Sequence, residues 1–172
     1  MSQMKDYIIH FAGLATGKHE FDFEINDKFF ANFEHALIQK GQIKAKVVME
    51  KKERMLLFDI DFKGNIDVVC DRCLEDFSLP VAGKEQLIAK LGDHFEEESE
   101  DVVIIPESDN KFNIAPYLYE YISLSLPVRI IHPDDDNGNS TCNPEMLEKL
   151  KLLSQPEKED SCWDILKNLK KE

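Results

Sequence analysis

Two neighbouring segments of the chain alternate apolar and charged side chains with a period of two residues. Ile43, Ala45, Val47 and Met49 alternate with mostly charged residues, and the same alternation returns over 56–62 after a charged turn at 51–54. Such alternation places apolar side chains on one face of a β-strand and charged side chains on the other. The pattern predicts a β-hairpin with one buried face, which constrains the fold more than any other feature.

Shorter strand patterns surround this hairpin. We expect strands at 7–11, 19–25, 66–70, 77–81, 84–91 and 102–105. The first two can pair through a turn at 16–18, and Gly64-Asn65 punctuates the chain before the third. So many strands with a single helix among them favour an antiparallel arrangement over a parallel α/β sheet. The acidic stretch 95–101 is expected to be a solvated loop.

Two segments have the period of an amphipathic helix. The first spans 27–37, with Asn26-Asp27 as its cap, Gly41 as its latest stop and an earlier end near Glu34 as the alternative. The second spans 113–126 and must close before Pro127. We expect the second helix to pack on the sheet. The predicted fold class is α+β: an antiparallel meander or small barrel-like sheet with a packed amphipathic helix and a partly ordered C-terminal tail.

The chain changes character after this β-rich core, which we assign to residues 1–131. Residues 132–172 form a polar extension with loop composition at 132–142, a short helix pattern at 146–153 and a linker at 155–160. The extension ends in a short apolar helix face that contains Trp163 and Leu166. A helix this short is marginal in water unless it docks on something.

The charge balance narrows the class of partner. The 172 residues include 34 Asp and Glu against 21 Lys and Arg, for a net charge of −13. Broad contact with nucleic acid or anionic lipid needs clustered cations, so we expect neither. The chain begins without the apolar stretch of a signal peptide, and no run approaches the roughly 20 apolar residues of a spanning helix. We therefore expect a cytoplasmic protein whose cysteines are thiols or metal ligands.

Cys70 and Cys73 form a C-x2-C pair between two predicted strands. Two thiolates at this spacing can bind one metal ion, as in the knuckles of zinc ribbons. Cys142 with either His132 or Cys162 would complete a tetrahedral zinc site. The pair is equally compatible with a turn of buried thiols without metal, so we predict no required cofactor and leave zinc open. Redox catalysis is disfavoured because the pair does not open a helix.

No catalytic motif accompanies the cysteines. The chain lacks a P-loop, a nucleophile elbow, a metalloprotease motif and a dinucleotide-binding glycine pattern. The acidic run 134–136 has the composition of solvated surface, because three adjacent carboxylates cannot converge on one cation. We therefore expect a protein that is not an enzyme.

Three ordered motifs resemble the YceD-like family. They are Val68-Val-Cys-Asp-Arg-Cys-Leu74, the helix Tyr117-Leu-Tyr-Glu120-Tyr-Ile-Ser-Leu-Ser-Leu-Pro127, and Asp160-Ser-Cys-Trp163-Asp-Ile-Leu166-Lys-Asn-Leu169 after a lone Cys142. The resemblance spans residues 40 to 172. Many relatives carry a second cysteine pair after the Leu-Pro segment, where this chain has only Cys142, with His132 ten residues earlier. Ser161 and Cys162 replace the Pro and Arg of the family's C-terminal motif.

The resemblance implies a non-enzymatic factor that supports large ribosomal subunit biogenesis and accumulation of 23S ribosomal RNA. Because the chain is acidic, we expect a basic protein partner, such as a ribosomal or RNA-processing protein, and indirect contact with the pre-ribosomal particle. A zinc-binding interaction module, or an adaptor unrelated to ribosomes, is the alternative. The candidate partner-binding residues are Arg72, Glu120, Trp163 and Leu166. Arg72 could instead pair with a local carboxylate, and Trp163 could pack on the chain's own sheet.

Overall fold

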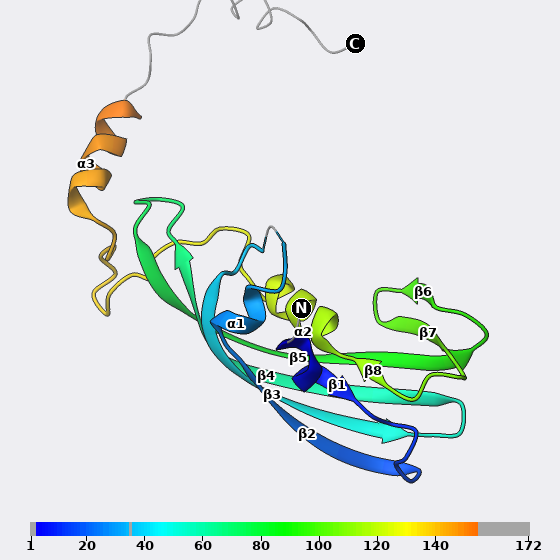
Figure 1. The fold of residues 1–172 in the computed structure, drawn as a ribbon. Coiled ribbons are helices and arrows are strands. Elements are labelled where there is room, and N and C mark those ends of the chain that lie inside the picture. Colours follow the sequence, from blue (N-terminus) through cyan, green and yellow to red (C-terminus); the bar gives the residue numbers. More distant parts are fainter. Residues whose placement is uncertain (1–2, 35, 155–172) are drawn as a thin grey trace, which may run out of the picture. The chain divides into compact units, whose positions relative to one another are not determined.

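The computed structural model describes residues 3–34 and 36–154 (Figure 1). The chain divides into two compact units. The first consists of Met1–Val69 and Asp76–Ile130, and the second of Cys70–Glu75 and Ile131–Glu172. The first unit carries the sheet and two of the α-helices, and the second carries the cysteines of the C-x2-C pair.

A six-stranded sheet dominates the first unit (Figure 1). Its strands, in spatial order, are β2 (Gly17–Ile25), β3 (Lys40–Lys51), β4 (Met55–Val69), β5 (Asp76–Gly92), β7 (Val102–Pro106) and β6 (Glu96–Ser99). Neighbouring strands are antiparallel except β5 and β7, which are parallel. The expected α+β class with a mostly antiparallel sheet is confirmed. The sheet is open, so the barrel-like alternative is not adopted.

Two strands run through positions where the sequence predicts a break. β4 continues through Gly64-Asn65 without a break. A Cβ at Gly64 would collide with the Gln42 carbonyl of β3, so glycine at this position allows the two strands to approach closely. The expected strands 77–81 and 84–91 are one strand, β5. Among the described strands, the first part of β5 pairs only with β4, so one of its edges is free of a neighbouring strand. Pro80, which has no backbone N–H to donate, is tolerated in this part.

The N-terminal pairing differs from the prediction. β2 pairs with β3 along all nine of its residues, and not with the segment 7–11. That segment contributes only the two-residue strand β1 (Ile8–Ile9), which pairs with β8 (Phe112–Asn113). The long β3 offers β2 a full set of hydrogen bonds, which a two-residue strand cannot match. The segment 95–101, expected as a loop, contains the exposed strand β6.

The helices follow the predicted places with different lengths. The helix expected at 27–37 is the single turn α1 (Asp27–Phe30), because the Asn32 amide donates to the Lys28 and Phe29 carbonyls and ends it. The expected 113–126 helix is α2 (Ala115–Leu124), preceded in the chain by β8. A 3-10 helix, η1 (Gln3–Tyr7), opens the described chain, and α3 (Pro144–Leu153) belongs to the second unit.

The core of the first unit lies between the sheet and the elements on one of its faces. Figure 1 shows α1, α2, β1 and β8 over the same face of the sheet. The largest fully buried rings come from α1 and β4: Phe29, Phe30, Phe58 and Phe62. α2 adds Leu118 and Ile122 to this core, so the expected docking of this helix on the sheet is confirmed. Among the described residues, no helix is both long and apolar enough to cross a membrane.

Candidate metal centre

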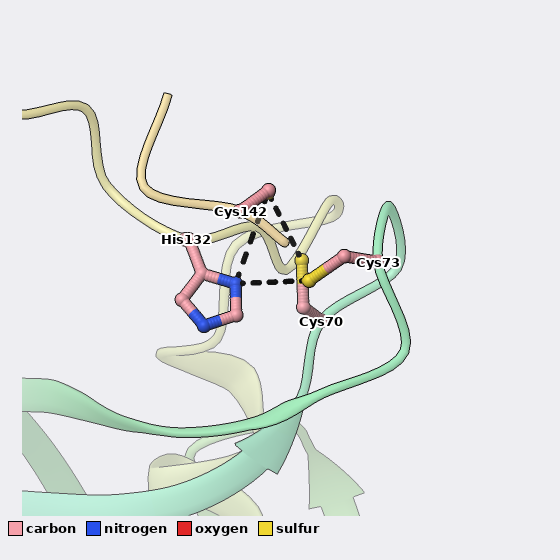
Figure 2. A group of neighbouring side chains, drawn as sticks. All are labelled: Cys70, Cys73, His132 and Cys142. Carbon is pink, nitrogen blue, oxygen red and sulfur yellow. Dashed lines mark hydrogen bonds between the residues drawn. The ribbon is translucent and has the colours of Figure 1, made fainter. Parts of the chain in front are cut away.

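The C-x2-C pair lies on a tight loop between the end of β4 and the start of β5 in the chain. Two backbone hydrogen bonds close this loop: Cys70 N–H donates to the Glu75 carbonyl, and Leu74 N–H donates to the Cys70 carbonyl, each at 2.9 Å. Leu74, directly after the second cysteine, has a φ of 62°. We call the loop Cys70–Glu75 the knuckle. The left-handed residue reverses the chain within it, and the thiols of Cys70 and Cys73 lie on the same side of the loop (Figure 2).

Four side chains of the second unit converge (Figure 2). The ligand atoms of Cys70, Cys73, His132 and Cys142 all lie within 4.8 Å of one another. The Sγ atoms of Cys70 and Cys142 are 3.8 Å apart, and His132 Nδ1 lies 3.3 Å from Cys73 Sγ and 3.8 Å from Cys142 Sγ. Tetrahedral bonds of about 2.3 Å to sulfur and 2.0 Å to nitrogen would place such atoms about 3.5–3.8 Å apart. The four atoms could hold a tetrahedral metal ion.

The knuckle also favours a thiolate at Cys70. Burial on its own would raise the pKa of the Cys70 thiol, but hydrogen bonds outweigh it and lower the pKa to about 5. They come from the backbone N–H groups of Cys73, Arg72 and His132 and from the His132 side chain; the one from Arg72 spans 3.4 Å. Burial instead raises the pKa of Cys73, which lies against two other thiols. A metal ion deprotonates its thiol ligands, so the cluster would release protons when it binds one.

Polar side chains tie the ligand-bearing segments together. Arg72 Nη1 donates to Ser140 Oγ at 2.9 Å, and Ser140 Oγ accepts from the Cys142 N–H at 3.3 Å. Asn143 caps α3 by accepting from the Glu145 N–H, and its amide donates to Glu75 Oε1 at 2.6 Å. These contacts orient Cys142 toward the knuckle. Ser140 carries no sequence signal of this role, whereas Asn143 before Pro144 is a recognisable helix cap.

The described part of the second unit buries little besides this cluster. Among its described residues, the three cysteines Cys70, Cys73 and Cys142 are the only buried side chains, and α3 buries none. A set of about 30 ordered residues normally needs a metal or disulfides because it cannot bury enough apolar surface. The three thiols are free cysteines.

The structure brings together the four candidate ligands, with His132 as the fourth. Cys162, the alternative fourth ligand, lies outside the described residues, as do the candidate partner residues Trp163 and Leu166. Arg72 lies on the knuckle and contacts Ser140. Glu120 is exposed on α2 in the first unit.

The acidic run 134–136 belongs to a turn. Asp135 accepts hydrogen bonds from the backbone N–H groups of Asn137 and Asn139, and bonds from Asn139 and Asn137 lower the pKa of its carboxyl. Asp135 therefore shapes the loop that separates His132 from Cys142.

Comparison with known proteins identifies a family model that matches the chain. The family model described as "Large ribosomal RNA subunit accumulation protein YceD" matches residues 58–170, a segment that contains all four residues of the cluster. No curated protein and no solved structure matches the chain. The family is described as an accumulation factor and not by a reaction. Because the match covers well over half of the 172 residues, the chain belongs to the YceD family.

Proposed function

We propose that this protein is a non-enzymatic cytoplasmic factor that supports accumulation of large-subunit ribosomal RNA by binding a basic protein partner. We also propose that zinc at the cluster of Cys70, Cys73, His132 and Cys142 holds its second unit in shape. The family description supports the process, and the cluster supports the part played by the metal.

One observation carries the zinc proposal: the cysteines are the only buried side chains among the described residues of the second unit. Ordering each residue costs about 1–2 kcal/mol, and the described residues of this unit form no apolar core to offset that cost. Zinc binding contributes about 10–16 kcal/mol in zinc-finger peptides. Three thiolates and an imidazole suit zinc better than hard cations. Four protein ligands fill a tetrahedral shell, which is typical of structural and not catalytic zinc.

The acidity of the chain supports a protein partner. A net charge of −13 repels a phosphate backbone and attracts a basic surface. A ribosomal protein or an RNA-processing protein would fit, with indirect contact to the pre-ribosomal particle.

Metal analysis of untagged protein tests the zinc site. We expect about one zinc per chain, lost in Cys73→Ser and in His132→Ala, because each variant removes a ligand. Cys162→Ser is the matched control: it also removes a cysteine and should retain zinc. A folded, metal-free wild-type protein would overturn the zinc proposal. Zinc loss in Cys162→Ser with retention in His132→Ala would assign the fourth ligand to Cys162.

Deletion of the gene tests the process. We expect mature large-subunit ribosomal RNA to fall relative to small-subunit RNA, and the wild-type gene to restore the ratio. Cys162→Ser should restore it as well as wild type, whereas Cys73→Ser should restore it less. An unchanged ratio in the deletion strain would overturn the proposed function while leaving the zinc site untouched.

A further inference from the structure

A pocket of about 380 Å³ lies in the first unit, where α2 meets β8 and the β6–β7 hairpin. Three aromatic side chains line it: Phe95, Phe112 and Tyr117. Phe112 and Tyr117 stack with their ring centroids 5.5 Å apart and an angle of 13° between their planes. Phe95 is 57% exposed, so much of its ring surface is accessible to a ligand. The pocket therefore offers accessible aromatic surface beside a packed pair of rings.

The same pocket is acidic at its rim. Glu97, Asp109 and Glu120 line it, against a single lysine, Lys111. All three carboxylate residues are exposed, and within the described ranges none of them forms an ion pair. One lysine does not balance three carboxylates, so the pocket presents net negative charge to a ligand.

Two of the carboxylates interact electrostatically with Tyr117, one of the aromatic residues that line the pocket. Burial raises the pKa of the Tyr117 hydroxyl, and the negative charges of Glu97 and then Glu120 raise it further. Both carboxylates therefore lie within electrostatic reach of the same ring, although one comes from β6 and the other from α2. A group that stacks on this ring would feel both charges.

We propose that this pocket binds an arginine side chain from a basic segment of a protein partner. A guanidinium group is planar and weakly hydrated, so it can stack on aromatic faces while it donates to carboxylates. Lysine lacks the planar face, and an uncharged apolar group would form no ion pair with the carboxylates. The inference rests on the proposed function, because it states the chemistry by which the basic partner is recognised.

Fluorescence anisotropy with full-length protein tests the pocket. The probe is a labelled peptide of alternating glycine and arginine, and its counterpart carries citrulline, which keeps the planar group without the charge. We expect salt-sensitive binding of the arginine peptide only. Glu97→Gln with Glu120→Gln should weaken binding at least about tenfold, because both carboxylates face the bound group. Phe95→Ala should weaken it about fivefold through loss of one cation–π contact.

A matched variant separates this pocket from general acidity. Asp22→Asn with Glu24→Gln removes the same two charges from exposed positions on β2, outside the pocket. It should change the affinity less than about twofold, because distant surface charges are screened. Equal losses in the two double variants, or an unaffected Phe95→Ala, would overturn the inference. Tighter binding of a labelled single-stranded RNA than of the arginine peptide would also overturn it.

The ribosomal RNA ratio in cells distinguishes the two proposals. If deletion lowers the ratio and the Glu97→Gln, Glu120→Gln gene restores it fully, the pocket is not the partner site but the proposed function stands. If deletion leaves the ratio unchanged while the peptide still binds the pocket, the proposed function fails and the arginine site stands. We expect deletion to lower the ratio and the pocket variant to restore it only in part.

Discussion

Leu74 holds a backbone conformation that leucine rarely adopts. Its φ of 62° lies in the left-handed region, where the Cβ atom crowds the following carbonyl oxygen and costs about 1–2 kcal/mol. The Leu74 side chain is 68% exposed, so packing does not repay this cost. The hydrogen bond from its N–H to the Cys70 carbonyl shows what the conformation achieves, which is closure of the knuckle. Strain at this residue therefore opposes assembly of the metal cluster.

Substitutions at Leu74 should change metal affinity without touching a ligand. Leu74→Gly removes the strain and should tighten zinc binding a few-fold, because glycine enters the left-handed region freely. Leu74→Val should weaken it by about tenfold, since a β-branched residue is a genuine outlier there. Competition with a chromogenic chelator measures both. Equal affinity of the glycine and valine variants would show that the knuckle backbone does not limit binding.

The sequence alone predicts all four candidate ligands, including His132, but not the loop geometry that brings the fourth one to the cluster. The C-x2-C spacing between two predicted strands indicates a knuckle, because a tight turn there lets both thiols reach one metal ion. The choice between His132 and Cys162 depends on the loop that ends at Cys142. That loop reverses through Gly138, at a φ of 79°, and through a bridge between Asp134 and Ser140. The reversal brings His132 beside Cys142, and no spacing rule encodes it.

At the scale of elements, the pairing of β3 with β4 requires their backbones to approach closely at Gly64. Gly64 faces Ile43 across the pair, and a Cβ at Gly64 would overlap the backbone of Gln42 and Ile43. Backbone cannot give way as a flexible side chain can. Gly64→Ala should therefore lower the free energy of unfolding by about 2–3 kcal/mol, measured by urea denaturation.

Gly13→Ala is the control for this substitution. A Cβ at Gly13 meets nothing within 4 Å, and its φ is not positive. This variant should leave the stability within about 0.5 kcal/mol of wild type. An equally small effect of Gly64→Ala would mean that the strands can separate there without loss of pairing.

The sequence predicts a helix or strand well where its periodic pattern is long, and poorly where the choice of partner strand determines the structure. The alternation over 43–49 and 56–62 predicts β3 and β4, and the spacing of apolar residues predicts α2. The partner of β1 could not be predicted, because β8 is a two-residue strand that lies far along the chain. α1 ends early because the Asn32 side chain donates to a carbonyl of the helix. The spacing of apolar residues carries no information about this hydrogen bond.

At the scale of the whole molecule, the net charge of −13 governs encounters with other molecules. The field of an acidic protein speeds association with a basic partner and slows approach to RNA. Association through such a field weakens as salt rises, because the Debye length falls from about 10 Å at 0.1 M to about 3 Å at 1 M. RNase would abolish a contact that runs through RNA, but it would leave a direct protein–protein contact intact.

These two properties predict the outcome of a capture experiment from cell lysate. The full-length protein, immobilised on resin, should retain a basic protein after RNase treatment, and raising the salt should release it. The Glu97→Gln, Glu120→Gln variant should retain less of the same protein, whereas Asp22→Asn, Glu24→Gln should retain as much as wild type. This comparison connects the global charge to one pocket: charge brings the partner near, and the aromatic rings and two carboxylates select arginine. If RNase removed all the captured protein, the contact would run through RNA, and the net charge would not describe how this protein finds its partner.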